Sequence, residues 1–314
     1  MAPNDSPMRI AISGASGFLG HAVESAIAAR GHTPVPIAQR AGFWHRPEER
    51  AALAQQLAGC AALINCAGRA HVAARSDDPR EWRALALVNR DFPQHLAQAA
   101  RTAQVGRFVH VSSVAALASA TGPGETIDDA TPPAPVTPYG RSKLEGDRAV
   151  LELAAEGFEV WVLRPPALYG PGAKGWFPAL IRAARLGLPL PLGAIDNRRS
   201  FAFVGNVADA IVETADAAAW PGVAGGAYVV TDSAPISSAE FYDHLCRGQG
   251  HGGRVWRLPP GLVKRLARIA LGDRAASLVG DASFDGARFR TSIGWTPPFD
   301  IAQAMAITLT GQPC

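Results

Sequence analysis

The sequence has few cysteines, no long apolar run and a polar beginning. Its cysteines, Cys60, Cys66, Cys246 and Cys314, form no Cys-x-x-Cys pair, so no zinc site is predicted and a reducing cytoplasm is the expected location. No uninterrupted apolar run approaches the roughly 18–20 residues of a membrane span, so no transmembrane segment is expected. The segment Met1–Pro7 has no apolar core behind a basic start, and it does not indicate a signal peptide.

The chain also lacks a strong charge of either sign. Lys and Arg number 30 and Asp and Glu 27, and the net charge of +3 is too small to indicate nucleic-acid binding. With 48% hydrophobic and 18% charged residues the composition is that of a globular protein. A chain of 314 residues can then form one large domain and a smaller lobe.

Short apolar runs alternate with segments of helical periodicity through the first half of the chain. The expected strands are Met8–Ser13, Val35–Ala38, Ala61–Asn65, Gly106–Ser112 and Phe158–Leu163. The expected helices are Phe18–Arg30, Glu48–Leu57, Trp82–Gln104 with a break at Pro93, and Tyr139–Glu156. This alternation predicts an α/β fold with a doubly wound, Rossmann-type parallel sheet.

The alternation weakens after Pro165, where glycine and proline become frequent. We therefore expect residues 1–165 to form the dinucleotide-binding domain, and residues 166–204 and 236–314 to form a smaller α+β substrate lobe. Ala227–Thr231 has the pattern of a further strand, so residues 205–235 are expected to return to the sheet.

Glycines recur at three-residue intervals in Gly14-Ala-Ser-Gly17-Phe-Leu-Gly20, between the first strand and the first helix. Small residues allow a tight turn close to a pyrophosphate, and the free N–H groups of the helix start attract it. The alternative is a packing turn without a ligand. The second strand ends at Gln39-Arg40 with no carboxylate to bind an adenosine ribose, so Arg40 predicts NADP(H) over NAD(H) unless it is only a surface charge.

Tyr139 and Lys143 are four residues apart and share one face of the expected helix. An ammonium roughly 4 Å away would lower the pKa of the phenol by as much as about 3, before burial opposes it. Taken alone, such a pair is also typical of an exposed helix. However, Ser112-Ser113 and Asn65-Cys-Ala-Gly68 end two strands at the carboxyl edge of the sheet, where ligands bind. A hydroxyl there can bond the reacting oxygen, although serine also forms turns and caps.

The ordered set of motifs resembles the extended short-chain dehydrogenase/reductase family. It comprises the glycine loop, Asn65–Gly68, Asn89, Ser113, Tyr139/Lys143, Arg164–Gly172 and Arg198–Asp209. Within that family the chain is most similar to UDP-sugar 4-epimerases and UDP-4-keto-sugar reductases, through Pro189–Ser200 and Gly294–Phe299.

The resemblance implies a catalytic triad of Ser113, Tyr139 and Lys143, and it also implies a homodimer. The implied cofactor site comprises Gly14, Ser16, Gly17, Phe18, Leu19, Gly20, Arg40, Asn65, Ala67, Gly68, Asn89, Ser112, Tyr139, Lys143 and Pro166. The implied substrate site comprises Arg69, His71, Ser113, Tyr139, Ala167, Trp176, Phe177 and Arg199.

Several of these assignments have a plainer alternative. Arg199, expected to reach a nucleotide diphosphate, is otherwise a surface charge beside a strand. Trp176 and Phe177, expected to stack on uracil, are otherwise core aromatics, and His71 is otherwise a surface histidine. Ala167 stands where the family commonly has an asparagine, which leaves the substrate open.

Three functions remain open from the sequence. The first is a UDP-sugar 4-epimerase, and the second is an NADPH-dependent 4-keto reductase, which an NADP preference favours. The third is a non-catalytic cofactor-sensing or binding module, for which the basic residues Arg254, Arg257, Lys264, Arg265 and Arg268 are the best support. Their spacing among leucines predicts instead an amphipathic helix with a solvated basic face, which could also contact an anionic membrane surface.

Overall fold

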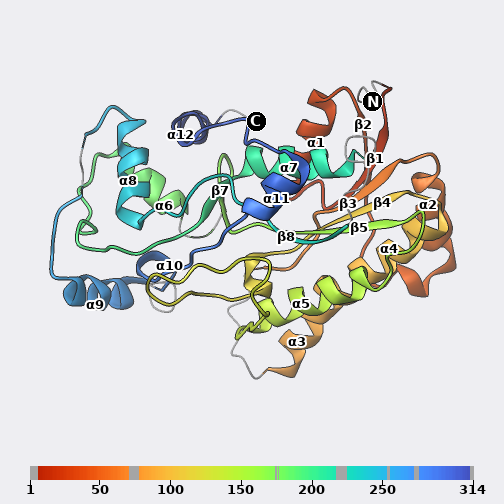
Figure 1. The fold of residues 1–314 in the computed structure, drawn as a ribbon, viewed down its shortest axis with the longest axis horizontal. Coiled ribbons are helices and arrows are strands. Elements are labelled where there is room, and N and C mark those ends of the chain that lie inside the picture. The colour runs from red at the N-terminus through yellow and green to blue at the C-terminus, as the bar shows by residue number, and fades with distance from the viewer. Residues whose placement is uncertain are drawn as a thin grey trace.

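A six-stranded parallel sheet forms the centre of the molecule (Figure 1). The computed structural model describes residues 6–70, 78–173, 175, 177–216, 225–252, 255–271 and 276–311. The strand order is β2-β1-β3-β4-β5-β8, and every neighbouring pair is parallel. The strands are β1 (Arg9–Ser13), β2 (Thr33–Ile37), β3 (Ala62–Asn65), β4 (Arg107–Val111), β5 (Glu159–Arg164) and β8 (Gly226–Val229). The predicted Rossmann-type sheet is confirmed.

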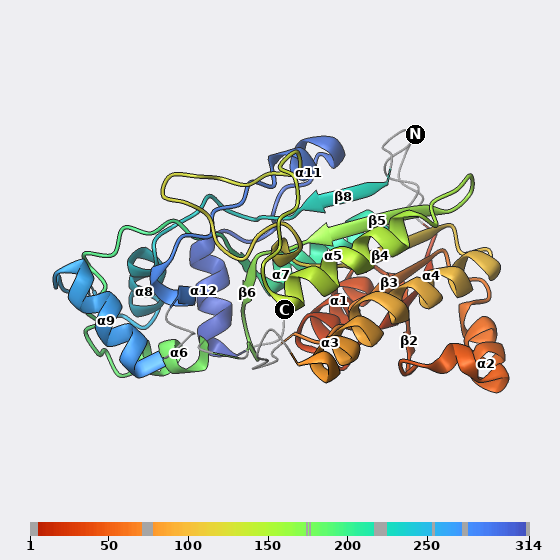
Figure 2. The same cartoon turned by 90° about the horizontal axis from the view of Figure 1, so that it is seen from below.

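Helices cover both faces of the sheet (Figure 2). One face carries α1 (Phe18–Ala29), α7 (Val204–Ala215) and α11 (Ala287–Ile293), and the other carries α2 (Pro47–Leu57), α3 (Pro79–Ala86), α4 (Phe92–Thr102) and α5 (Pro138–Leu151). Strand side chains alternate between the faces, so Ile10 and Ile12 join the core beside α1 and α7, whereas Ala11 joins the core beside α2 and α4. The central strands β1, β3, β4 and β5 are buried on both faces and are mostly apolar.

The break predicted at Pro93 within the helical segment Trp82–Gln104 is confirmed, and it takes the form of a π turn just before the proline. A π turn at Leu87–Asp91 separates α3 from α4. Pro93 lacks an N–H group and cannot bond the carbonyl of Asn89 four residues earlier, so the regular helical pattern breaks there. The helix predicted over Tyr139–Glu156 ends earlier, at Leu151, and the chain then turns through Gly157 at φ +76° into β5.

The smaller lobe packs beyond the carboxyl edge of the sheet. It contains the two-stranded sheet β6 (Ala167–Tyr169) and β7 (Phe201–Phe203), with helices α6 (Phe177–Arg185), α8 (Ser238–Arg247), α9 (Pro260–Leu271), α10 (Ala276–Val279) and α12 (Ile301–Thr310). β8 pairs with β5, which confirms the strand predicted to return to the sheet.

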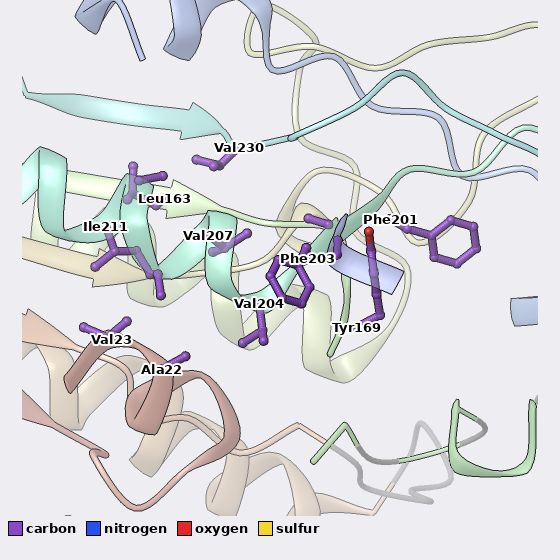
Figure 3. Packing of buried hydrophobic residues seen from close by; sticks show 14 of the residues in the cluster. Ala22, Val23, Leu163, Tyr169, Phe201, Phe203, Val204, Val207, Ile211 and Val230 are labelled. Carbon is purple, nitrogen blue, oxygen red and sulfur yellow. The ribbon is translucent and has the colours of Figure 1, made fainter. Parts of the chain in front are cut away.

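The two parts share one continuous apolar core. Figure 3 shows Val207 and Ile211 of α7 lying between the sheet and α1, while Tyr169 and Phe203 extend the same cluster into the lobe. Phe203 directly precedes α7, so one segment of chain is anchored in both parts. This shared packing fixes the lobe over the strand ends where the candidate site lies.

Candidate active site

A cavity of about 870 Å³ lies at the carboxyl edge of the sheet. Its walls come from the start of α1, the ends of β4 and β5, the start of α5, and the lobe. Twelve of the residues that the sequence predicts for the site line it: Gly17, Phe18, Leu19, Gly20, Gly68, Ser112, Ser113, Tyr139, Pro166, Ala167, Phe177 and Arg199. Segments far apart in the sequence therefore meet where the strand-end motifs predicted a site.

The glycine loop is shaped by two close backbone approaches. A Cβ on Gly14 would lie 2.6 Å from the backbone nitrogen of Ala67, and one on Gly20 would lie 2.0 Å from the carbonyl oxygen of Gly14. Gly14 also has φ +75°, which favours glycine. The N-cap position of α1 is occupied by Gly17, which has no side chain to bond the first N–H groups of the helix, and the first turn carries no acidic residue. The cavity thus meets an uncapped helix N-terminus suited to a phosphate.

The phenol of Tyr139 is hydrogen-bonded to Ser113 at the cavity wall. Thr137 caps α5 by accepting a bond of 3.1 Å from the Gly140 N–H, and Pro138 occupies the first turn. Ser113 has an extended backbone, and its hydroxyl also accepts a bond of 3.2 Å from the Ala115 N–H. The serine is therefore both a turn former and a partner of the tyrosine.

The expected acidification of Tyr139 by Lys143 is wrong for the structure as it stands. Burial raises the pKa of Tyr139, and the bond from Ser113 opposes this only in part. The ammonium of Lys143 donates instead to the carbonyl oxygen of Val111, at 2.7 Å. Removal of the phenol from water thus outweighs the attraction expected from spacing alone.

Lys143 is 3% exposed and lies behind the cavity wall. Burial lowers its pKa to about 8, and the carboxylate of Asp147 opposes the shift. A Cβ on Gly68 would lie 3.9 Å from its Nζ, so this glycine of the strand-end loop lies next to the lysine. The lysine is close enough to neutrality for its charge to vary near physiological pH.

A buried network of polar side chains lies next to Lys143, and the sequence did not predict it. Asp147 accepts a bond of 2.9 Å from Nε of Arg164, and its other oxygen lies 3.9 Å from Nε2 of His110. Burial raises the pKa of Asp147, whereas Arg164 and the hydroxyl of Ser112 oppose this. Burial and the Lys143 charge lower the pKa of His110 well below its usual value.

Asn65 extends this network across the sheet rather than facing the cavity. It is fully buried, its Nδ2 lies 3.0 Å from Nδ1 of His110, and its Oδ1 accepts bonds from Ser13 and from the Ala67 N–H. Because an amide NH₂ can only donate, His110 is neutral with its proton on Nε2. Asn65 therefore shapes the turn at Ala67 from inside the sheet.

Asn89 also holds a loop in place. Its side chain accepts from the Arg69 N–H at 2.9 Å, and donates to the Arg69 carbonyl at 3.0 Å and to the Ser142 hydroxyl at 2.9 Å. The Arg69 guanidinium points to Glu81, at 3.3 Å, instead of lining the cavity as predicted. The π turn therefore connects the loop after β3 to the helix that carries Tyr139.

Two glycines let α5 approach these site segments. A Cβ on Gly140 would lie 2.3 Å from the carbonyl oxygen of Ala115, beside the Ser113 turn. A Cβ on Gly146 would lie 2.0 Å from the carbonyl oxygen of Asn89 in the π turn. Any larger residue would push the helix away, so these glycines set the position of Tyr139 and Lys143.

The lobe contributes Arg199 and several apolar side chains. Arg199 is 9% exposed, donates to the carbonyl oxygen of Gly280 at 2.8 Å, and burial lowers its pKa to about 10. It is therefore not the surface charge of the alternative interpretation. Phe177 touches the cavity but is 3% exposed and packs on Tyr169 and Phe241, as a core aromatic does.

Arg40 lies at a different cavity, of about 450 Å³, at the tip of β2. Arg46 lines the same cavity and pairs with Glu49, and Glu48 lies there as well. Arg46 was not predicted, because it lies beyond the strand end on the following helix cap.

Some residues of the cavity wall were not predicted from the sequence, and some predicted residues lie outside this wall. Ser119, Thr137, Ala282 and Phe284 line the cavity without belonging to any motif in the sequence. Gly14, Ser16 and Ala67 lie in or beside the turns at its edge rather than in its wall. His71 and Trp176 fall outside the described residues.

The fold and the site together define a Rossmann-type protein with a serine, a tyrosine and a lysine at one sheet edge. A model of the NAD dependent epimerase/dehydratase family matches residues 10–230. The chain belongs to the NAD-dependent epimerase/dehydratase family, and the predicted resemblance to extended short-chain dehydrogenases/reductases is confirmed.

Its relatives include both epimerases and reductases. The chain is 32% identical over 244 residues to a UDP-glucose 4-epimerase of Vibrio cholerae, covering 75% of this chain and 72% of that protein. It is 32% identical over 308 residues to a 3-diazoavenalumate denitrifying reductase of a Streptomyces species, covering 92% and 96%. The structure of RMD from Pseudomonas aeruginosa complexed with NADPH has a TM-score of 0.73 at 23% identity, covering 97% and 98%.

Proposed function

We propose that this protein is an NAD(P)-dependent enzyme acting at C4 of a UDP-sugar, of the 4-epimerase type. The observation that carries the proposal is one cavity joining the glycine loop, the hydrogen-bonded Ser113–Tyr139 pair and the buried Arg199. A proton-transfer pair then lies between a cofactor site and a site for a second phosphate group. The relatives of this chain include proteins named as an epimerase and as a reductase, and the proposed arrangement of residues suits either reaction.

The residues present fit a dinucleotide cofactor. The uncapped start of α1 at Gly17 suits the pyrophosphate, and Gly68 and Lys143 suit the nicotinamide ribose. When bound, the cofactor supplies hydride exchange with carbon 4 of the sugar. The rest of the chemistry is proton transfer and positioning by the protein.

Tyr139 would take the proton of the sugar 4-hydroxyl and later return it. Because burial raises the pKa of the phenol, it is protonated at neutral pH before the ligands bind. Removing a proton therefore requires the positive charges of Lys143 and the bound cofactor nearby, whereas donating a proton does not. Ser113, already bonded to the phenol, would hold the reacting oxygen beside it.

Arg199 would bind the diphosphate of the substrate. Its guanidinium is nearly buried at the lobe side of the cavity, where a bidentate ion pair is least screened by water. Ala167, where an asparagine is common in the family, leaves this wall without an amide donor. The small side chain also leaves room for a substituent on the sugar.

The second candidate is a one-way NADPH-dependent 4-keto reductase. It is favoured by Arg40 and Arg46 at the tip of β2, since two guanidiniums suit a 2′-phosphate, and by the raised pKa of Tyr139, which suits a proton donor. Glu48 and Glu49 in the same cavity weaken the argument for NADP(H). A non-catalytic module is not favoured, because it has no use for a serine, a tyrosine and a lysine around an open cavity.

Incubation with UDP-glucose or UDP-N-acetylglucosamine, and separately with a UDP-4-keto-sugar and NADPH, separates these functions. An epimerase produces the 4-epimer without consuming added cofactor, whereas a reductase oxidises one NADPH for each UDP-4-keto-sugar. Tyr139→Phe is the matched control, since it removes only the hydroxyl. If this variant keeps the activity of the wild type, both proposals are contradicted. Light scattering of the same preparation tests the proposed homodimer.

A further inference from the structure

The exposed large apolar side chains gather at one end of the lobe. Among the described residues, Leu87 and Val136 lie elsewhere, and the rest lie here: Leu186, Leu188, Trp256, Leu262, Leu266 and Ile269. Figures 1 and 2 both place α9 at the extremity of the molecule opposite to β2 and α2. We call this surface, made by those six residues, the α9 face.

Helix α9 is apolar on its outer side as well as toward the core. Val263 is 3% exposed and joins the lobe core, whereas Ile269 is 75% exposed. Leu262, Leu266 and Ile269 follow at i, i+4 and i+7, so they form one stripe on the helix. A helix that only packed on the lobe would carry polar residues along this stripe.

The segment before α9 continues the same surface. The backbone of Leu190 pairs with Val255, and the Trp256 N–H donates to the Leu190 carbonyl at 3.1 Å. The Tyr242 hydroxyl donates to the Leu188 carbonyl at 2.6 Å, so this backbone is fixed although the Leu188 side chain is 47% exposed. Two segments from different parts of the sequence therefore present apolar side chains together.

The sequence segments that contribute to this surface carry charge of one sign. Residues 175–195 and 244–272 contain no Asp or Glu and eight Lys and Arg: Arg182, Arg185, Arg247, Arg254, Arg257, Lys264, Arg265 and Arg268. Arg257 and Arg265 are exposed beside the apolar residues. Two copies of such a face would repel each other, because a two-fold contact brings like charges together.

We propose that the α9 face lies on the surface of a membrane that contains anionic lipid. An amphipathic helix with leucine, isoleucine and tryptophan on one side and arginine and lysine beside them binds the lipid interface in this way. The apolar stripe enters the boundary between headgroups and acyl chains, while the cations remain with the phosphates. No helix among the described residues is both long and apolar enough to cross a bilayer, so the contact is superficial.

Flotation with lipid vesicles tests this proposal. The full-length protein is mixed with phosphatidylcholine vesicles with and without phosphatidylglycerol, at low and at high salt. We expect flotation with the anionic vesicles and much less with the neutral ones or at high salt. Leu266→Asp with Ile269→Asp should lower the partition coefficient about tenfold or more, because two apolar side chains no longer insert.

Matched variants keep the test specific. Val136→Asp changes a side chain of similar exposure, 70%, on a distant loop, and should float like the wild type. Arg257→Gln with Arg265→Gln should weaken flotation, whereas Arg80→Gln, at a side chain 88% exposed on α3, should not. Circular dichroism and thermal melting establish that each variant is folded.

The proposal is overturned if the protein does not float with anionic vesicles, or if the double aspartate variant floats as well as the wild type. It is also overturned if sedimentation finds a dimer that the double aspartate variant abolishes while vesicles stay unbound. Tyr139→Phe should float unchanged, so failure of the proposed enzymatic function would be recognised separately.

Discussion

Gly146→Ala should destabilise the protein and displace its catalytic helix, although alanine is the better helix former. The added Cβ would lie 2.0 Å from the carbonyl oxygen of Asn89, and the distance must reach at least 3.0 Å. Because that oxygen belongs to the backbone of the π turn, α5 and the turn must separate by about 1 Å. Overpacking of this kind costs about 1–3 kcal/mol, and the gain in helix propensity offsets about 1 kcal/mol of it.

The displacement should also reach the chemistry. Tyr139 and Lys143 lie on the same helix as Gly146, and Ser142 is bonded to Asn89 in the turn that must move. A misplacement of about 1 Å lowers turnover by as much as about 100-fold. We therefore expect both a lower midpoint of urea unfolding and a lower kcat.

Gly261→Ala is the matched control, since Gly261 is also helical and a Cβ there would meet nothing within 4 Å. It should leave kcat unchanged and should raise stability by up to about 1 kcal/mol. Urea unfolding followed by circular dichroism, with steady-state kinetics on the same samples, measures both effects. If Gly146→Ala is as stable and as active as the wild type, the close approach of α5 to the π turn does not position the site.

Four further outcomes are expected. Tyr139→Phe should lower turnover by about 10²–10⁴-fold with little change in cofactor affinity, measured by kinetics and by fluorescence titration with NADPH. Because the pKa of Lys143 is lowered to about 8, the folded protein binds fewer protons than the unfolded chain above that pH. Its free energy of unfolding, relative to Lys143→Met, should therefore rise with pH from about 8 toward 10.5, the usual pKa of lysine, and urea unfolding at several pH values measures this. The value of kcat/KM should fall above pH about 8, as Lys143 of the free enzyme loses its charge. Asp147→Asn should move this fall to lower pH, because the carboxylate raises the pKa of the lysine. If the fall stays at the same pH in the variant, another group is titrating. Arg40→Gln should weaken NADPH binding about tenfold or more and leave NADH binding unchanged, and calorimetry that finds equal losses for both would remove the 2′-phosphate assignment.

Strands and helices could be predicted from the local sequence wherever tertiary packing favoured the same structure. Every strand of the first half was found close to its predicted place, because strands buried on both faces must be apolar and are bounded by glycine or polar turns. The break in the helix at Pro93 was predicted, but its form was not. The missing N–H indicated a break, but the choice of a π turn depends on Asn89 bonding Arg69 and Ser142, which lie 20 and 53 residues away.

The candidate site also contains residues that the sequence could place and residues that it could not. Gly17, Ser113 and Tyr139 could be placed because strand ends of a parallel sheet meet at one edge, whatever the details of packing. The wall formed by Thr137, Ala282 and Phe284 could not be placed, since it comes from loops that carry no motif. Arg69 was misplaced because its nearest acid, Glu81, belongs to another element.

Sequence alone was enough for the order of strands and helices, the glycine loop and the spacing of Tyr139 and Lys143, because each depends on neighbours a few residues apart. Tertiary structure decided the protonation of the tyrosine and lysine. Spacing predicted that the ammonium would acidify the phenol, but burial acts on both groups and depends on the whole surrounding fold. The same holds for Asp147, Arg164 and His110, which became one network only when strands and a helix brought them together.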